Sequence, residues 1–188
     1  MSLEEKLIES KELFSGKIIR VLLDKVTLPN GHEAPREVVR HNGAACVLAI
    51  TPDNKVILVK QYRHPTGEIM LEVPAGKLDK PKEAAAGAAL RELAEETPYT
   101  AQSVTLLHEF YSAPGFCDEK LFLYQANGVQ QNSQLSADED EFVETVLLTK
   151  KQVKQALKKR KIVDAKTIIA LQTWLLQGKS KRMQRKPV

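Results

Sequence analysis

Short apolar segments separated by polar turns recur along most of this chain, and this pattern predicts β-strands. Pro29-Asn30-Gly31 follows the first of these segments and predicts a hairpin turn, and Pro52-Asp53-Asn54 separates a later pair of segments. The predicted strands cover residues 16–28, 36–40, 44–51, 55–61, 70–73, 104–111, 120–125 and 142–148.

Three other segments have the composition or the apolar spacing of helices: residues 84–90, 149–159 and 164–177. The first of them is alanine-rich, and Pro81 suits the first turn of a helix there. In the last one the apolar residues form a wide stripe, and we interpret Trp174 as a core residue rather than a ligand-stacking one. Strands flanked by a few helices, without regular strand–helix alternation, predict an α+β fold or a mixed-sheet sandwich.

Three glutamates, Glu92, Glu95 and Glu96, have the spacing that places them on one face of a helix. Like charges so arranged repel one another, and a divalent cation relieves that repulsion. Carboxylate oxygens are hard ligands that suit Mg²⁺ or Mn²⁺. The alternative is a solvated acidic face in which Arg91 pairs with Glu95 or Glu83. We expect a structural role for Arg91 and Glu83, and metal binding by the three glutamates.

From Gly76 onward the chain reads G-x5-E-x7-R-E-U-x-E-E, with U aliphatic, and this segment resembles the signature of the Nudix hydrolases. The resemblance implies an α+β fold, an α/β/α sandwich with a mixed sheet, preceded by a small β-rich amino-terminal domain. It implies a dimerisation and substrate-binding domain at residues 1–42, a catalytic domain at residues 43–178 and a basic tail at residues 179–188.

Within this box the resemblance implies a role for each residue that matches the signature. Gly76, Glu83 and Arg91 are structural, and the carbonyl of Ala75 joins the three glutamates as a metal ligand. Glu92 and Glu96 are therefore predicted to serve in catalysis through the metal.

The box departs from the family at Pro98, where the family has a second glycine. That glycine ends the helix in a conformation of positive φ, which proline cannot adopt. Because a residue before proline disfavours helical geometry, we expect the helix to end at Glu96 or Thr97 and the turn into Tyr99 to differ from the family's. The box glutamates precede the change, so we expect them to keep their role.

Pro114 lies 15 residues after Tyr99, where the ADP-ribose pyrophosphatases of this family carry a marker proline in a loop that usually reads S-P-G-F. Here the loop reads Ser112-Ala113-Pro114-Gly115-Phe116, so Ala113 either replaces the family serine or is inserted after it. Taken alone, the loop is an ordinary Pro-Gly turn. Its register with the box favours the resemblance, which extends from about residue 14 to residue 177.

An acidic run covers residues 137–141, and a solvated loop is the default interpretation of such a run. The resemblance implies instead that Glu139 is the catalytic base and that Glu141 is a further metal ligand. Attack of water on a phosphoanhydride needs a carboxylate within hydrogen-bonding reach, and a mobile loop can deliver one when substrate binds.

Arg36 and Arg63 match positions that contact the pyrophosphate or the terminal ribose in the similar enzymes. A planar guanidinium can hold two phosphate oxygens at once. The alternative for Arg36 is an ordinary surface charge on a strand. Four more residues are predicted to contact the substrate: Glu37, Glu72, Pro114 and Gly115.

The net charge of +4 hides an asymmetry between the two parts of the chain. Residues 1–150 carry 16 basic and 23 acidic side chains, a net charge of −7, whereas residues 151–188 carry 12 basic side chains and one acid, a net charge of +11. An acidic body suits divalent metal and argues against a general nucleic-acid binder. The basic end either touches RNA or another anionic surface or is a solvated, frayed tail; we favour the tail because the last ten positions contain no aromatic residue.

Two cysteines, Cys46 and Cys117, are too few for a disulfide framework, and neither has a partner at metal-ligand spacing. The first residues lack the basic-then-apolar order of a signal peptide, and no apolar run is long enough to cross a membrane. These features predict a cytoplasmic protein that does not associate with membranes.

The resemblance leads to one main prediction of function: metal-dependent hydrolysis of ADP-ribose to AMP and ribose 5-phosphate, with Mg²⁺ or Mn²⁺. It implies a homodimer in which the amino-terminal sheets are exchanged. Two alternatives stay open. The substrate is another nucleotide sugar, such as GDP-mannose or ADP-glucose, or the protein is a non-catalytic ADP-ribose sensor whose box is distorted at Pro98.

Overall fold

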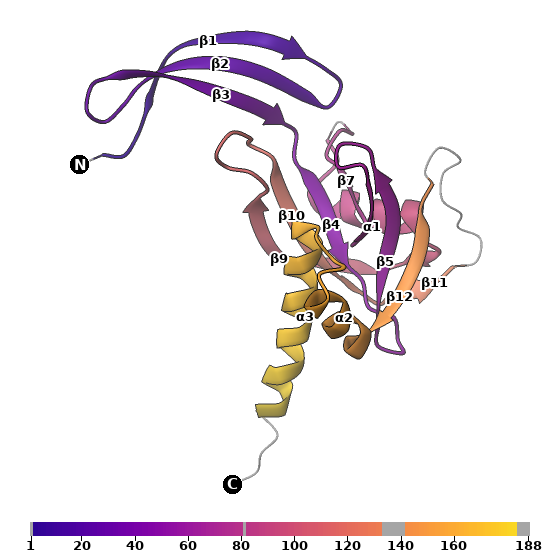
Figure 1. Ribbon diagram of the computed structural model, residues 1–188. Helices are drawn as coiled ribbons and strands as arrows, with labels where there is room; N and C mark the ends of the chain where they lie inside the picture. The colour runs from indigo at the N-terminus through magenta and orange to yellow at the C-terminus, as the bar shows by residue number, and fades with distance from the viewer. Residues whose placement is uncertain (1, 81, 133–141, 184–188) are drawn as a thin grey trace. The chain divides into compact units, whose positions relative to one another are not determined.

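The chain folds into two units, which Figure 1 presents as a ribbon. This computed structural model describes residues 2–80, 82–132 and 142–183. The first unit consists of Met1–Gly43 and Phe110–Leu121, and the second of Ala44–Glu109 and Phe122–Val188.

The first unit contains an antiparallel sheet in the order β1-β2-β3. Its strands are β1 (Lys6–Ser15), β2 (Ile19–Thr27) and β3 (Glu33–His41). The predicted hairpin turn between β2 and β3 is confirmed: Gly31 has φ 84°, and its N–H donates to the Leu28 carbonyl at 2.9 Å. Strand β1 was not predicted because irregularities in its pairing, between Leu7 and Glu9 and between Glu12 and Phe14, break the alternation that marks a strand.

The second unit contains a four-stranded sheet, a three-stranded antiparallel sheet and one short strand pair. The four-stranded sheet has the order β7 (Ala75–Lys77), β4 (Ala44–Leu48), β10 (Lys120–Asn127), β9 (Ser103–Tyr111). The three-stranded sheet has the order β12 (Glu144–Thr149), β5 (Lys55–Arg63), β6 (Glu68–Glu72), and the pair joins β11 (Gln130–Gln131) to β8 (Tyr99–Thr100). The predicted strands of this unit are confirmed, whereas β7, β8 and β11 are too short to produce a periodic pattern.

The buried strand β4 is covered by α1 (Ala85–Glu96) and α3 (Ala165–Met183), and α2 (Lys150–Lys158) packs against β12 and α3. Helix α1 packs against β4 and β7, and α3 packs against β4 and β6. All five residues of β4 are buried, which requires that both faces of the strand be covered. On the α1 side, Ala88 and Ala89 let the helix approach Ala45 and Val47 closely. The predicted α+β sandwich with a separate amino-terminal sheet is confirmed.

Helix α1 ends at Glu96, as the sequence predicts, and Thr97 completes its last turn. Thr97 has φ −142° and ψ 157°, an extended conformation that the following Pro98 favours. Its hydroxyl donates to the Leu93 carbonyl at 2.5 Å and accepts a bond from the N–H of Tyr99 at 3.3 Å. The Thr97 side chain thus satisfies a carbonyl at the end of α1. Many helices end instead with a glycine of positive φ.

Helices α2 and α3 are joined through Trp174, which is buried as predicted for a core residue. The Lys150 ammonium lies 4.7 Å from the centre of the Trp174 ring and donates to the Trp174 carbonyl at 3.2 Å. Thr149 and Gln152 form a capping box that starts α2. No helix in the described part of the chain is long and apolar enough to cross a membrane.

Candidate functional site

The three box glutamates project from helix α1, which buries two of them. Glu92 is 7% exposed and Glu96 is 4% exposed, whereas the side chain of Glu95 is 31% exposed. The Nη1 atom of Arg91 donates to Glu92 Oε1 at 2.6 Å and to Glu95 Oε2 at 2.5 Å. The Arg91 guanidinium therefore bridges Glu92 and Glu95. Its positive charge offsets the repulsion that the sequence predicts between these carboxylates.

Arg91 is also bound by Glu83, which lies before the start of the helix. The Nε atom of Arg91 donates to Glu83 Oε1 at 3.0 Å, and its Nη2 atom donates to Glu83 Oε2 at 3.0 Å. These hydrogen bonds to Glu83 raise the pKa of Arg91, and they lower the pKa of Glu83. The paired charges hold the segment before α1 against the helix.

The segment around β7 lies directly against the same carboxylates. A Cβ built on Gly76 would lie 1.9 Å from Glu92 Oε1, so only glycine leaves room for this carboxylate. The N–H of the preceding residue, Ala75, donates to Glu96 Oε2 at 3.1 Å. The structure thus brings together Ala75, Gly76, Glu92 and Glu96, which the sequence analysis assigned to one site.

The donor set of this cluster fits a hard divalent cation. Glu92, Glu95 and Glu96 offer carboxylate oxygens, and Ala75 lies within hydrogen-bonding distance of Glu96. With Arg91 drawn between Glu92 and Glu95, the described residues contain no group of three or more His, Cys, Asp or Glu side chains already arranged to hold a metal ion. The predicted metal-binding roles therefore stay predictions.

Arg63 and Glu72, both predicted to contact substrate, bind each other. Arg63 Nε donates to Glu72 Oε1 at 2.7 Å, and Arg63 Nη2 donates to Glu72 Oε2 at 2.9 Å. Burial acts to raise the pKa of Glu72, but the hydrogen bonds from Arg63 and the nearby charge of Lys166 outweigh it and lower that pKa. Sequence reasoning missed Lys166, which binds Glu72 from the start of α3.

The remaining predicted substrate residues line one cavity of about 410 Å³ within the first unit. Arg36 and Glu37 line it from β3, and Pro114 and Gly115 line it from the loop between β9 and β10. The exposed rings of Tyr111 and Phe116 line it as well. Arg36 pairs with Glu5 through Nε at 2.9 Å and Nη2 at 2.5 Å, and these bonds raise the pKa of Arg36.

Asp118 joins the Pro114–Gly115 loop to strand β3. Its carboxylate accepts from the N–H of His41 at 2.8 Å and from Arg40 Nη1 at 3.1 Å. Between the same segments, the N–H of Val39 donates to the Phe116 carbonyl at 2.7 Å, and the N–H of Asp118 donates to the Val39 carbonyl at 3.1 Å. Hydrogen bonds within the first unit thus hold the loop that contains Pro114 against strand β3.

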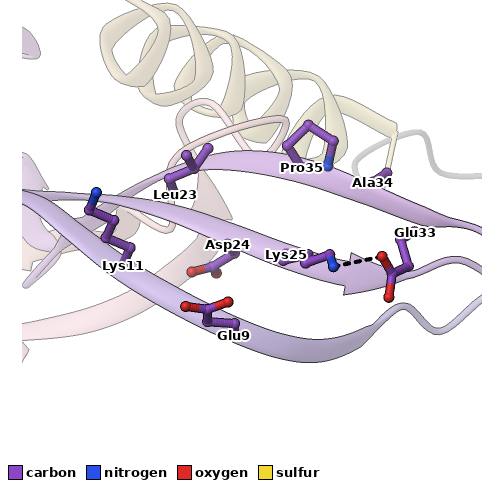
Figure 2. A pocket seen from close by; sticks show the side chains of 8 residues that line it. All are labelled: Glu9, Lys11, Leu23, Asp24, Lys25, Glu33, Ala34 and Pro35. Carbon is purple, nitrogen blue, oxygen red and sulfur yellow. Dashed lines mark ion pairs between the residues drawn. The ribbon is translucent and has the colours of Figure 1, made fainter.

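A second hollow, of about 440 Å³, opens on the sheet of the first unit (Figure 2). Its lining mixes both signs of charge, and Lys25 Nζ pairs with Glu33 Oε2 at 2.6 Å. None of the residues that the sequence analysis assigned to the site lines it. The predicted base Glu139 and the predicted ligand Glu141 lie outside the described residues.

Comparison with protein families identifies the class to which this fold and carboxylate cluster belong. Residues 39–171 match the NUDIX domain, and residues 5–39 match the nucleoside diphosphate sugar hydrolase N-terminal domain. The chain belongs to the Nudix family, and the predicted membership is confirmed.

Individual relatives cover almost the whole chain. The chain is 44% identical to the methanol dehydrogenase activator of Bacillus methanolicus, over 93% of this chain and 94% of that protein. It is 44% identical to the ADP-ribose pyrophosphatase of Bacillus subtilis (strain 168), over 91% of this chain and 92% of that protein. A crystal structure of an ADP compounds hydrolase has the same fold, with a TM-score of 0.82 at 24% identity, and the match covers 99% of this chain and 100% of that one.

Proposed function

We propose that this protein hydrolyses the pyrophosphate bond of ADP-ribose and releases AMP and ribose 5-phosphate, with Mg²⁺ or Mn²⁺ as its metal. The observation that carries the proposal is the 44% identity to a Bacillus ADP-ribose pyrophosphatase over 91% of the chain. The convergence of Ala75, Gly76, Glu92 and Glu96 on one face of α1 supports it.

The cation would be held by the ligands that the family resemblance implies: Glu92, Glu95, Glu96, the carbonyl of Ala75 and Glu141. A bound divalent ion would neutralise the charge of the pyrophosphate and lower the pKa of a water molecule. Glu139 would then accept the proton of the attacking water, as a general base does.

Binding of the substrate is assigned to residues of each unit. In the second unit, Arg63 would bind pyrophosphate oxygens, because a guanidinium suits them and Glu72 already orients it. In the first unit, Arg36, Glu37, Pro114 and Gly115 would contact the substrate at their shared cavity, whose exposed aromatic rings suit a nucleobase.

We also infer a homodimer formed through the amino-terminal sheet. Several large apolar side chains of this sheet are exposed, among them Leu7, Ile8, Leu13, Phe14 and Leu23. Exposed apolar residues gathered on one sheet mark an interaction surface, and a second copy is the partner that the family resemblance implies. Cys46 and Cys117 are not joined in a disulfide, which supports action in the reducing cytoplasm.

The test is an assay of AMP release with Mg²⁺ across a panel of ADP-ribose, ADP-glucose and GDP-mannose, compared by kcat/KM. We expect the highest kcat/KM for ADP-ribose. A preference for one of the other sugars would select that substrate instead. Binding of ADP-ribose without hydrolysis of any of the three would select the sensor.

A second candidate function comes from the relative in Bacillus methanolicus, whose name states that it activates methanol dehydrogenase. Its identity to this chain, 44%, equals that of the pyrophosphatase. The test is to add the protein, and separately its Glu96→Gln variant, to an assay of methanol dehydrogenase. Stimulation by the wild type alone would mean that activation uses the hydrolytic site.

A further inference from the structure

Lys166 is largely buried at the start of α3, where it binds two carboxylates. Its side chain is 12% exposed, and its Nζ atom donates to Glu72 Oε2 and, at 3.1 Å, to Asp164 Oδ1. Burial acts to lower the pKa of Lys166, but the charges of Asp164 and Glu72 outweigh it and raise that pKa. The ammonium is therefore charged, and the protein itself supplies its partners.

The position of Lys166 is fixed by a buried hydroxyl. Thr167 donates through Oγ1 to Asp164 Oδ2 at 2.5 Å and accepts from the N–H of Val73 at 2.8 Å. Its own N–H donates to the same Asp164 oxygen at 3.0 Å. These bonds tie the first turn of α3 to the chain two residues before Ala75, which itself binds Glu96.

Glu72 lies between Lys166 and Arg63, and its buried carboxylate is bound from both sides. Arg63 uses Nε and Nη2 for Glu72, and among the described residues its Nη1 atom has no acceptor. The Arg63 side chain is 38% exposed. Its hydrogen bonds to Glu72 raise the pKa of Arg63 despite burial, and the charge of Glu96 adds to that effect. The partly exposed guanidinium thus keeps one donor atom, Nη1, without a partner among the described residues, and Glu96 is close enough for the two charges to interact.

We propose that Lys166 is a positioning residue: it holds Glu72, and Glu72 holds the Arg63 guanidinium so that Nη1 is presented to a phosphate oxygen of the substrate. This inference rests on the proposed hydrolysis of a nucleotide diphosphate sugar. Without Lys166, the buried Glu72 and the half-buried Asp164 lose the ammonium that pairs with both of them, and Arg63 is left as the cation beside these two acids. An uncompensated buried carboxylate is costly, so Arg63 shifts to neutralise both acids, and its Nη1 atom loses the position in which Glu72 and Lys166 held it.

The test measures binding of the non-hydrolysable α,β-methylene analogue of ADP-ribose in Mg²⁺, alongside KM and kcat for ADP-ribose. Lys166→Met keeps an unbranched side chain of nearly the same length and removes its charge. We expect it to raise both Kd and KM by roughly 10- to 100-fold, the usual effect of removing a partner that orients a binding residue. We expect kcat at saturation to change much less, because the carboxylates of the metal cluster stay in place. Lys166→Arg restores the charge and is expected to recover most of the affinity.

Lys150→Met is the matched control, since Lys150 is also a partly buried lysine held between two helices of the same unit. We expect it to lower Tm without changing Kd. An equal change of Kd in both variants would show a general loss of stability and overturn the proposal. If Lys166→Met does not fold, Lys166→Gln takes its place, and failure of both to fold would mean that Lys166 is structural only.

A double-mutant cycle tests whether Lys166 acts through Arg63. Arg63→Lys keeps the charge and removes the planar fork, so Lys166→Met should change Kd little when it is added to Arg63→Lys. Fully additive effects would overturn the proposal. A wild type that binds the analogue but does not cleave ADP-ribose would contradict the proposed function while the Kd values still test Lys166. A wild type that neither binds nor cleaves would contradict both.

Discussion

Gly76 and Glu92 lie in such close contact that the carboxylate of Glu92 occupies the place where a side chain of residue 76 would begin. The two are brought together by β7 and α1, which pack against each other. A Cβ on Gly76 would lie 1.9 Å from Oε1 and 2.0 Å from Cδ of Glu92. The glycine of the box therefore serves the geometry of a carboxylate rather than the flexibility of a turn.

Gly76→Ala should displace Glu92 and lower kcat by roughly 10²- to 10⁴-fold, because a misplaced ligand loses most of its stabilisation of the transition state. Gly87→Ala is the control, since Gly87 lies in α1, the helix that carries Glu92. The new Cβ at residue 87 would lie 3.7 Å from Glu83 Cγ, an ordinary contact distance. The control should raise stability by about 0.5–1 kcal/mol and leave kcat unchanged. Full activity of Gly76→Ala would mean that Glu92 is free to move without consequence.

Glu96→Gln should lower kcat by roughly 10²- to 10⁴-fold at saturating Mg²⁺, since a neutral amide is a poorer ligand for a hard cation. The fold should survive, because the amide oxygen still accepts the hydrogen bond from Ala75. The control is Glu144→Gln, at an exposed glutamate paired with Lys60. Turnover close to wild type in Glu96→Gln would remove this residue from the proposed metal site.

Glu139→Gln should lower kcat by roughly 10²- to 10⁴-fold with little change in substrate affinity, which is the signature of a lost general base. Glu141→Gln should instead raise the concentration of Mg²⁺ needed for half-maximal rate. Steady-state kinetics over a metal titration separates the two effects. If Glu139→Gln were fully active, residues 137–141 would be only a solvated loop, and another residue would have to act as the base.

Pro98→Gly should cost about 0.4–1 kcal/mol of stability and leave hydrolysis unchanged, because the glycine adds freedom only to the unfolded chain. Thr97 is already extended and caps the Leu93 carbonyl, so no residue of positive φ is needed at the end of α1. Chemical denaturation measures the change in the free energy of unfolding. A wild type without activity that this substitution revives would favour the ADP-ribose sensor.

The sequence predicted those parts of the site that depend on local spacing. Glu92 and Glu96 share a helical face because they are four residues apart, and the end of α1 followed from the restriction that Pro98 places on Thr97. Strand β1 escaped prediction because its irregular pairing with β2 shifts the side-chain alternation twice.

The partners of the site residues depend on contacts that no local pattern contains. Lys166 meets Glu72 across 94 residues of sequence, and Asp118 binds the backbone of His41 across 77. The tertiary fold therefore determines which acidic side chain pairs with which partner. The sequence offered one hint, since Asp164 and Thr167 have the spacing of a helix cap, which places Lys166 in the first turn of α3.

The contact between Lys150 and Trp174 makes the protein its own spectroscopic probe. The chain has one tryptophan, so all indole emission comes from the junction of α2 and α3. A buried indole beside an ammonium emits differently from one in water, and separation of the two helices should therefore shift the emission to longer wavelength. Intrinsic fluorescence can then follow the opening of this junction in every variant, without substrate, metal or label.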